Sequence, residues 1–533
     1  MPAPNASQQI QEMPVNLVGG STFGRYPKIS NSQTWNMIVS DNFLVPYAGY
    51  KSVIRTSSQA PGRGIHTSTR GNFMIAVVGD VVYKISTALI ATQLSTLSTT
   101  TGDVYISENN NSQICITDGS YVYVYNYSAT PPGNFIQLTS GVGGQFPYQN
   151  PGYISFQNGR LIIASLQTSV WVMSAINDAT DWTSSAAYQG ALESKPDYVQ
   201  AALPIPGAGN NLFLFGSTVA EQWQDVGAAL FPYQRASTFN VDYGCLNASS
   251  IAYLNNYVVW LAINEQSGPV IMVATGSNVK AITTDGIDFK LGNLTNPTNC
   301  TAFLFQQDGH LIYQFTFITD NLSYAYDFES GLFFNISDPN LNYHPAREVV
   351  YFNNQYFFVS LNGGNIYLFD TNLSHATYDD GSQDEIPRIR ITPPLRKPDQ
   401  RYFIIKSLGF TIENGEPNKF TNRISQQLQL GISLATEGGK DLTTENNVLI
   451  DTQLNIAPTT ISTISSQRVD LSISRDGGEN FGSSFGLDMN PTGKRKSRFI
   501  FQRLGQANDI TFQIRLHGFE RYVLTEGLVE IYT

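Results

Sequence analysis

The sequence predicts an all-β protein in which a β-propeller of six or seven blades is followed by a β-sandwich. Two patterns carry this prediction. Seven hairpin-like units recur between residues 61 and 385, and strongly alternating polar and apolar segments fill much of residues 386–533. Repeats of this period are typical of propellers, and such alternation is typical of half-buried antiparallel sheets. Helical periodicity is nearly absent from the chain.

Residues 1–60 contain no copy of the repeat. They are rich in proline, glycine and aromatic residues, as in "FLVPYAGYKSV" at 43–53. We expect this segment to form an N-terminal extended arm, and two placements for it stay open. The arm could lie on neighbouring subunits, or it could complete the last blade of the propeller.

Residues 61–385 hold the repeat. In each unit a polar turn precedes a β-rich run, and a second turn leads to another β-rich run, as in "NGRLIIASLQTSVWVMSA" at 158–175. Val, Ile, Tyr and Phe favour strands, while Gly, Asn and Asp favour turns. The units begin at Gly71, Asn111, Asn158, Asn210, Asn255, Asp308 and Asn353. Their spacing of about 40 to 53 residues is that of a four-stranded blade, and seven hairpins are too many for a single sandwich.

Residues 386–533 follow a boundary that is rich in proline, "EIPRIRITPPLRKPDQ" at 385–400. Proline cannot donate to a strand ladder, so such a segment separates domains rather than forming the centre of a sheet. Alternating runs follow it, among them "RYFIIKSLGFTIE", "QQLQLGISLAT" and "DITFQIRLHG". We predict that these runs form a C-terminal β-sandwich.

Charge is sparse in this chain and is unevenly spread. Charged residues make up 14% of the 533 residues, whereas about a quarter is usual. Residues 1–385 carry 13 Lys and Arg against 27 Asp and Glu, while residues 386–533 carry 18 against 15. A step of this kind predicts two regions with different partners. The acidic region would repel nucleic acid unless basic residues cluster locally.

The cysteines and the N-terminus indicate the compartment. Cys115, Cys245 and Cys300 lie far apart and form no CxxC pair, so we predict buried, reduced thiols rather than a disulfide framework or a zinc site. The N-terminal "MPAPNASQQIQEMPVN" lacks the basic start and apolar centre of a secretory signal. No apolar run approaches the roughly 20 residues of a membrane span. We expect a protein that has no membrane anchor and folds in a reducing cytoplasm.

Motifs for catalysis and nucleotide binding are weak. "NPTGKRKS" ends like a phosphate loop, but Asp488 stands where the motif requires its first glycine. No GxSxG occurs, and the five histidines have unrelated neighbours. "SRDGGENFG" at 474–482 resembles the Asp-box turn of sialidase propellers, where the box is a structural turn. The basic residues of the propeller region form no cluster that would hold a substrate carboxylate.

We therefore predict no catalytic residue, no cofactor and no metal ligand set. The oxygen-rich stretch "TDNLSYAYDF" at 319–328 lacks the spacing of a calcium loop, although a cation at a propeller turn stays open. Trp171 and Met173 share the apolar face of one strand, and we expect them to serve packing rather than ligand binding.

The densest positive charge of the chain lies in "GKRKSRFIFQRLG" at 493–505. It comprises Lys494, Arg495, Lys496, Arg498 and Arg503. Three interpretations stay open: a solvated loop, a docking contact to an acidic protein, and a contact to DNA phosphates. We take these five residues as the candidate partner-docking site.

Four motifs, taken in order, resemble the tail hub, or packaged-DNA stabilisation, protein family of short-tailed bacteriophages. They are "MPVNLVGG" followed by "FLVPYAGYKSV", then "NGRLIIA…VWVMSAINDATDW", "FGSTVAEQWQDVGA" and "RFIFQRLGQANDITFQIRLHG". Each motif alone is weak, but together they span nearly the whole chain in the expected order. The family typically has Pro-Gly where this chain has Ala48-Gly49, so that turn departs from the pattern.

The resemblance implies a structural protein of the virion tail, assembled in the cytoplasm of the bacterial host. It also implies that the β-sandwich of residues 386–533 is a docking domain. It implies a homo-hexameric ring below the portal and its adaptor, which continues the DNA channel and holds the genome until infection. Such a ring carries tail fibres or spikes and a plug or needle, and double-stranded DNA passes through it. No catalytic residues come with the family. Two alternatives stay open: a propeller that hydrolyses or depolymerises glycans, and a glycan-binding lectin propeller.

Overall fold

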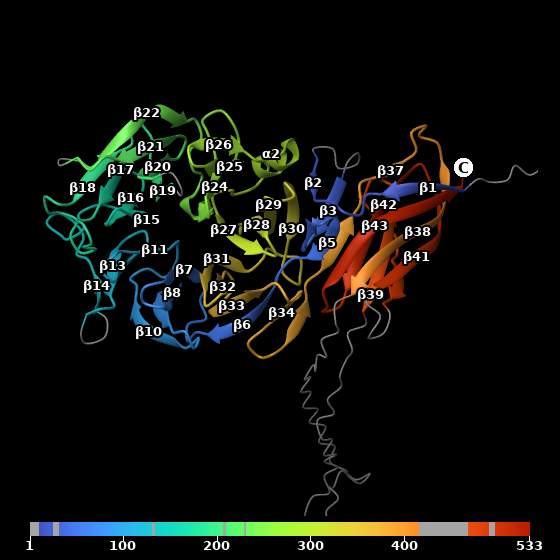
Figure 1. The fold of residues 1–533 in the computed structure, drawn as a ribbon, viewed down its shortest axis with the longest axis horizontal. Coiled ribbons are helices and arrows are strands. Elements are labelled where there is room, and N and C mark those ends of the chain that lie inside the picture. Colours follow the sequence, from blue (N-terminus) through green and yellow to red (C-terminus); the bar gives the residue numbers. More distant parts are fainter. Residues whose placement is uncertain are drawn as a thin grey trace, which may run out of the picture.

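The computed structural model describes residues 10–24, 31–129, 134–205, 209–228, 231–414, 467–489 and 496–532. In these residues almost all regular structure is β-strand, apart from helix α2 (Asp285–Gly292) and the short 3-10 helix η1 (Ala248–Ser250). Figure 1 shows a ring of sheets with a second β-rich body beside it. The predicted fold class, an all-β propeller followed by a sandwich, is confirmed.

Seven four-stranded antiparallel units form the blades of the ring. The strands of blades one to four are β7 (Gly62–Ser68), β8 (Phe73–Val78), β9 (Val81–Ile85) and β10 (Ala91–Thr96); β11 (Tyr105–Glu108), β12 (Gln113–Thr117), β13 (Val122–Asn126) and β14 (Asn134–Gln137); β15 (Pro151–Gln157), β16 (Arg160–Ser165), β17 (Val170–Met173) and β18 (Tyr188–Ala191); and β19 (Val199–Pro204), β20 (Asn211–Gly216), β21 (Ala220–Asp225) and β22 (Tyr233–Val241). Blade five consists of β23 (Ala252–Leu254), β24 (Tyr257–Ala262), β25 (Val270–Thr275) and β26 (Asn278–Ala281). Blade six consists of β27 (Cys300–Gln307), β28 (His310–Phe317), β29 (Leu322–Asp327) and β30 (Leu332–Ile336). Blade seven consists of β31 (Ala346–Phe352), β32 (Gln355–Ser360), β33 (Asn365–Asp370) and β6 (Gly49–Arg55).

The seven predicted hairpins are the two middle strands of the seven blades, for example β16 and β17 for the unit that begins at Asn158. Local chemistry explains why these hairpins are visible in the sequence. Asn158 and Gly159 precede β16 with φ of 49° and 84°, and Asp308 and Gly309 precede β28 with φ of 50° and 92°. Asn-Gly and Asp-Gly pairs favour the left-handed backbone that a two-residue hairpin turn requires.

A separate hydrophobic core lies between each pair of neighbouring blades, since a single blade cannot bury its apolar faces alone. Seven such clusters follow the ring, from the one between blades one and two to the one between blades seven and one. Trp171 and Met173 are buried in the cluster between blades three and four, so their predicted role in packing is confirmed. Cys115, Cys245 and Cys300 are buried and unpaired, as predicted.

Two sheets form the sandwich, and one core cluster fills the space between them. The first sheet consists of β4 (Met37–Ser40), β5 (Phe43–Pro46), β43 (Tyr522–Tyr532), β38 (Phe403–Asn414) and β41 (Lys496–Ala507), with β1 (Ile10–Val15) paired to β43. The second consists of β3 (Asn31–Trp35), β36 (Arg388–Ile391), β42 (Asp509–His517), β39 (Arg468–Ser474) and β40 (Phe485–Asp488), with β2 (Thr22–Phe23) on β3 and β37 (Leu395–Arg396) on β42. The predicted strand "QQLQLGISLAT" lies outside the described residues.

The propeller and the sandwich share a sheet. Strand β3 pairs antiparallel with β36 of the sandwich, and Trp35 on β3 also pairs in parallel with Asn335 on β30, the outer strand of blade six. Figure 1 shows β3 and β5 between the ring and the sandwich strands. Strands β34 (His375–Thr377) and β35 (Gln383–Glu385) extend blade seven beyond β6. The two domains are therefore joined by hydrogen-bonded strands and not only by a linker.

The described part of residues 1–60 forms short strands that pair within their own chain rather than an extended arm. Strands β1, β4 and β5 join one sandwich sheet, and β2 and β3 join the other. Strand β6 lies antiparallel to β33, with Tyr50 opposite Phe369. The second predicted placement, in which this segment completes the last blade, is therefore correct for β6. The domain limits at residues 60 and 385 stay predictions.

Candidate functional site

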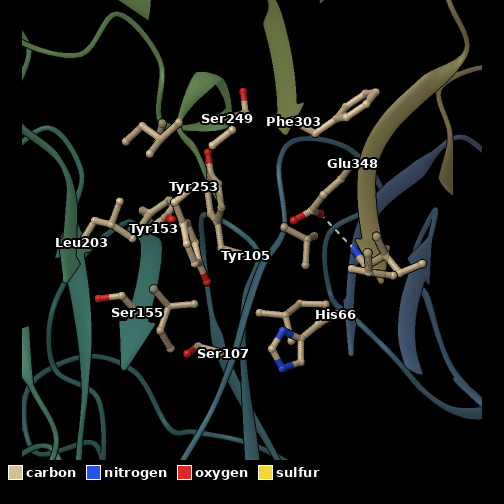
Figure 2. A pocket seen from close by; sticks show the side chains of 18 of the residues that line it. His66, Tyr105, Ser107, Tyr153, Ser155, Leu203, Ser249, Tyr253, Phe303 and Glu348 are labelled. Atoms are coloured by element: carbon tan, nitrogen blue, oxygen red, sulfur yellow. Dashed lines mark hydrogen bonds between the residues drawn. The ribbon is translucent and has the colours of Figure 1, made fainter. Parts of the chain in front are cut away.

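A cavity lies at the centre of the propeller (Figure 2). Its volume is about 630 Å³, which lies in the range of small-molecule sites. Its lining comes from the innermost strand of each blade or the segment just before it, that is, from β7, β11, β15, β19, β23, β27 and β31. All seven blades therefore contribute to one site, and none of these strands belongs to a predicted hairpin.

Glu348 on β31 presents its carboxylate to this cavity (Figure 2). Its Oε2 accepts a hydrogen bond from the amide of Ile65 on β7, at 3.0 Å. Burial raises the pKa of Glu348 to about 7, because the charged form loses hydration there. Arg347, the preceding residue, is engaged elsewhere: it forms an ion pair with Asp103 and donates from Nε to the carbonyl of Arg63 at 3.1 Å.

The guanidinium of Arg63 donates hydrogen bonds to the backbone of the segments around it. It donates to the carbonyl oxygens of Gly79, Thr99, Thr101 and Gly102 at 2.7 to 3.0 Å. Burial lowers the pKa of Arg63. A guanidinium with this many backbone acceptors fixes the loop that leads into β11, so its role is structural.

Glu108 on β11 is also held by its neighbours. Its Oε1 accepts hydrogen bonds from Ser68 Oγ, at 3.0 Å, and from the hydroxyl of Tyr127. Burial alone would raise the pKa of Glu108, but the interactions with His66, Tyr127 and Ser68 outweigh burial and lower it. His66 Nε2 lies 3.9 Å from the second carboxylate oxygen, beyond hydrogen-bond distance.

Three tyrosines line the wall opposite Glu348 (Figure 2). The ring centroids of Tyr105 and Tyr153 lie 5.2 Å apart, and Tyr253 projects into open space with 57% of its surface exposed. Reasoning from sequence misses this site, because tyrosines also fill the cores and the innermost strands precede the recognisable hairpins. Segments before the hairpins, such as "TGDVYISE" at 101–108, hold the residues that could have indicated it.

Three of the five predicted docking residues lie on one strand of the sandwich. Lys494 and Arg495 are outside the described residues. Lys496, Arg498 and Arg503 are exposed residues of β41, which is the last strand in its sheet within the described part of the chain. The structure therefore brings three of the five residues onto one strand.

Alternation along β41 explains which side chains reach solvent. Lys496, Arg498 and Ile500 point outward, while Ser497 and Phe499 are buried. We call the surface formed by Lys496, Arg498 and Ile500, with its two positive charges, the basic face of β41. Charged side chains on an edge strand also keep it from pairing with other strands, so solvation alone remains a sufficient reason for this pattern.

The neighbouring strand β38 complements the basic face of β41. Lys496 lies opposite Glu413 and Arg498 lies opposite Thr411 in the strand register. Arg498 reaches over Gly409, where its Nη2 lies 3.8 Å from the position that a Cβ would occupy. These contacts orient the two basic side chains without burying them.

The Asp-box-like segment is a structural turn of the sandwich. It connects the paired strands β39 and β40. Asp476 accepts hydrogen bonds from Ser474 Oγ at 2.5 Å, from the Glu479 amide at 3.2 Å and from the Asn480 amide at 3.1 Å. These hydrogen bonds, first that of Ser474, lower the pKa of Asp476. The carboxylate is thus used to close its own turn.

The histidines are distributed between the core, the domain junction and the cavity. His310 and His344 are buried, and burial lowers the pKa of His344 to about 3. His517 lies 3.3 Å from carboxylate oxygens of Glu385 and of Asp470. These three have structural roles, whereas His66 lines the cavity.

The part of the chain that the structure describes contains neither a cluster of metal-ligating side chains nor a membrane-spanning helix. In these residues no group of three or more His, Cys, Asp or Glu side chains could hold a metal ion. None of the described helices has the length and apolar character needed to cross a membrane.

Two family models match the sequence. The model described as bacteriophage P22 Gp10, β-propeller, matches residues 25–374, and the model described as bacteriophage P22 Gp10, β-sandwich, matches residues 431–532. No curated protein matches the sequence.

A comparison with solved structures gives matches at low identity, three of which follow. A streptogramin B lyase is 10% identical over 60% of this chain and 97% of its own, with a TM-score of 0.40. An inactive virginiamycin B lyase from Staphylococcus aureus with quinupristin is 10% identical over 60% of this chain and 99% of its own, with a TM-score of 0.41. The computationally designed Ika8 protein is 11% identical over 67% of this chain and 99% of its own, with a TM-score of 0.36.

Proposed function

The chain belongs to the bacteriophage P22 Gp10 family, and we propose that it is a tail hub that extends the portal channel, retains packaged DNA and anchors fibres or a plug. Membership in this family makes it a structural component of a phage tail. The observation that carries the proposal is that both domain models match, in order, over 25–374 and 431–532.

In this proposal six copies form a ring on the portal adaptor, assembled in the bacterial cytoplasm. The ring binds tail fibre or spike proteins and a plug or needle, and double-stranded DNA passes through it transiently. The uneven charge supports this arrangement. The acidic region 1–385 gives little counterion-release attraction, so that DNA is not held tightly by the wall it passes.

The docking surface in this proposal is the basic cluster of the sandwich. It consists of Lys494, Arg495, Lys496, Arg498 and Arg503, and its partner is an acidic protein neighbour. The exposure of Lys496 and Arg498 on an edge strand supports the proposal. Each exposed pair contributes only about 0.2–1 kcal/mol, but repetition around a ring adds avidity.

The joint between propeller and sandwich supports a mechanical role. Arg390 on β36 is buried, and its guanidinium donates to the carbonyls of Asn16, Gly19 and Gly20 at 3.1, 3.2 and 3.0 Å and to Thr34 Oγ1 at 2.9 Å. Burial lowers the pKa of Arg390 to about 10. This single side chain ties the N-terminal segment to the sheet that both domains share.

A second buried arginine, Arg388, fixes the sandwich segment that blade seven contacts. Arg388 donates to the carbonyls of Gly518 and Glu520, and its guanidinium lies 4.8 Å from the centre of the Tyr522 ring. Ser374, beside blade seven, donates to the carbonyls of Phe519 and Glu520 at 3.0 and 2.9 Å. A joint with this many buried contacts transmits force between the domains instead of acting as a hinge.

We propose no catalytic role for this chain. Glycan hydrolysis needs two carboxyl groups that are free to act as acid and as base or nucleophile. Of the three carboxylates that line the cavity, Asp103 pairs with Arg347, and Glu108 is held by Ser68 and Tyr127. Glu348 alone is left, so the geometry does not favour a hydrolase.

Mass photometry of the purified chain with and without its adaptor tests the proposal. We expect a monomer or weak association for the chain alone, because an isolated flat interface only modestly exceeds the cost of association. With the adaptor present we expect six copies on one assembly. A tight dimer under both conditions would contradict the tail-hub proposal.

A further inference from the structure

The charges that line the central cavity do not balance. Three carboxylates and two guanidiniums contribute to the lining: Asp103, Glu108, Glu348, Arg63 and Arg347. Both guanidiniums and two of the carboxylates are engaged in the contacts described above. With all three carboxyl groups ionised and His66 neutral, the surplus is one negative charge, and Glu348 is the carboxylate that neither a cation nor a side-chain donor holds.

Glu348 has no ion-pair partner among the described residues. Its one hydrogen bond to a protein group is the bond from the Ile65 amide to Oε2. A carboxylate that is desolvated without a cation is costly in its charged form. Because the carboxylate points into the cavity, a ligand there can supply the missing positive charge (Figure 2).

The wall opposite Glu348 suits an organic cation with an apolar body. Tyr105, Tyr153 and Tyr253 present aromatic rings there, and the faces of such rings attract ammonium groups and pack against apolar surface. Leu203 adds apolar lining. An inorganic cation would leave this aromatic surface unused.

Polar atoms around the same cavity also lack hydrogen bonds to the protein. His66 Nε2, Thr67 Oγ1 and Ser155 Oγ are buried, and the protein gives none of them a hydrogen bond. All three residues belong to the lining. Buried polar atoms are normally satisfied, so their gathering at one cavity indicates a place for a ligand or for water.

We propose that the central cavity of the propeller binds a small organic ammonium compound with one positive charge and an aromatic or similarly apolar body, its ammonium on Glu348. A volume of about 630 Å³ is sufficient for such a molecule. The binding site lies within one chain, so it does not depend on the tail-hub proposal. A failure of ring assembly would leave it untouched, and a failure of binding would leave the tail-hub proposal untouched.

Isothermal titration calorimetry of the full chain with 2-phenylethylammonium tests the proposal, with the neutral 2-phenylethanol as the matched probe. At pH 8 we expect the cation to bind at least tenfold more tightly than the alcohol. Glu348→Gln should reduce the affinity for the cation at least tenfold and leave that for the alcohol within about twofold. Glu265→Gln, which removes a carboxylate in an exposed loop away from the cavity, should change neither.

The pH dependence of binding supplies a second readout. Glu348 must be ionised to hold the ammonium, and burial raises its pKa to about 7, so the affinity of the native chain should rise between pH 6 and pH 8. The groups that face Glu348 from its own strand and from neighbouring elements are Arg347, Arg63, His66, Asp103, Glu108, Tyr105, Tyr153 and Tyr253. In Glu348→Gln the rise should disappear.

Three results would overturn the proposal: no heat of binding at millimolar cation, equal affinity for cation and alcohol, or equal affinity for the cation in the native chain and in Glu348→Gln. A melting curve of each variant confirms that it is folded before titration. Tyr153→Leu keeps the charge and removes one ring. It should weaken binding of the cation about threefold or more, and an unchanged affinity would count against the aromatic wall.

Discussion

At the scale of single residues, this fold holds charged groups in two different ways. The guanidinium of Arg390 has four oxygen acceptors at hydrogen-bond distance. The carboxylate of Glu348 has one donor, the Ile65 amide. The first residue stabilises a joint between segments far apart in the sequence. The second has no counter-charge once it is ionised, so its effect on stability depends on pH.

We expect Glu348→Gln to stabilise the protein at pH 8 and to have little effect at pH 4. In the folded chain Glu348 keeps its proton up to about pH 7, whereas the ordinary value of 4.5 applies after unfolding. The folded state thus binds more protons between these values, and stability falls as pH rises from about 4.5 to 7. Glutamine does not titrate, so the free energy of unfolding of Glu348→Gln should not fall in this way. Its excess over that of the native chain should grow between pH 4.5 and pH 7 to roughly 1–3 kcal/mol.

Urea unfolding of both chains at several pH values measures this gain. Glu265→Gln is the control, since its carboxylate is exposed and its removal should not create a pH-dependent difference. A pH-independent difference between Glu348→Gln and the native chain would show that the carboxyl is not desolvated.

At the scale of single elements, strand β6 closes the propeller. It supplies the outer strand of blade seven from the N-terminal segment. Ring closure therefore joins residues that are about 320 positions apart in the chain, as Tyr50 and Phe369 are. Tyr50 is 2% exposed and makes edge-on contacts with His344, Phe358 and Tyr367. The strand is therefore held by packing as well as by its ladder.

We expect Tyr50→Ala to destabilise the propeller by about 3–5 kcal/mol, because it removes a large buried ring and leaves a cavity. Tyr402→Ala is the matched control, since Tyr402 is 67% exposed and its loss should cost less than about 0.5 kcal/mol. Thermal unfolding of both variants measures the difference. Equal melting temperatures would show that β6 contributes little to ring closure.

The edge strand β41 carries the docking prediction. We expect the double variant Lys496→Ser with Arg498→Ser to fold normally, because its charges are exposed and such charges contribute little to stability. Assembly on the adaptor should weaken and become more sensitive to salt, because each copy loses the same contacts. Mass photometry of assembly at low and at raised salt measures this.

The control for the edge-strand variant is Lys280→Ser with Lys290→Ser. It also removes two exposed positive charges, but it removes them from the propeller region. It should leave assembly unchanged. If the edge-strand variant also assembles normally at raised salt, the basic face of β41 is only solvated.

At the scale of the whole molecule, the shared sheet couples the two domains. Asn36 lies at the point where the domains meet, with φ of 54°. Its Nδ2 donates to Ser337 Oγ and to the Pro387 carbonyl, both at 2.8 Å, and its Oδ1 accepts from the Ser337 amide at 2.8 Å. One buried amide thus connects blade six with the segment that enters the sandwich.

Because of this coupling, we expect the propeller and the sandwich to unfold in one transition, and Asn36→Ala to separate it into two. The variant leaves buried polar groups unpaired and should cost about 2–4 kcal/mol. Asn354→Ala is the control: Asn354 has φ of 60° but lies exposed in a turn, so it tests the backbone conformation alone. Scanning calorimetry measures the number of transitions. Two transitions in the native chain would contradict the coupling.

The sequence by itself determined the elements whose signals are local. The middle hairpin of every blade is visible because its alternation and its turns, such as Asn158-Gly159 and Asp308-Gly309, depend only on neighbouring residues. The difference in charge between residues 1–385 and 386–533 and the basic cluster of 493–505 are likewise found by counting residues along the sequence. They locate a candidate docking region. The class of fold followed from the number and spacing of these hairpins.

Only the tertiary structure decided what depends on pairing between distant segments. The closure of the ring by β6, the sheet shared through Trp35 and Asn335, and the meeting of Glu348 with three tyrosines join residues far apart in the chain. No local pattern specifies such pairs, because a strand has the same alternation whichever strand it pairs with. The cavity and its unbalanced carboxylate exist only once seven blades have closed around one axis.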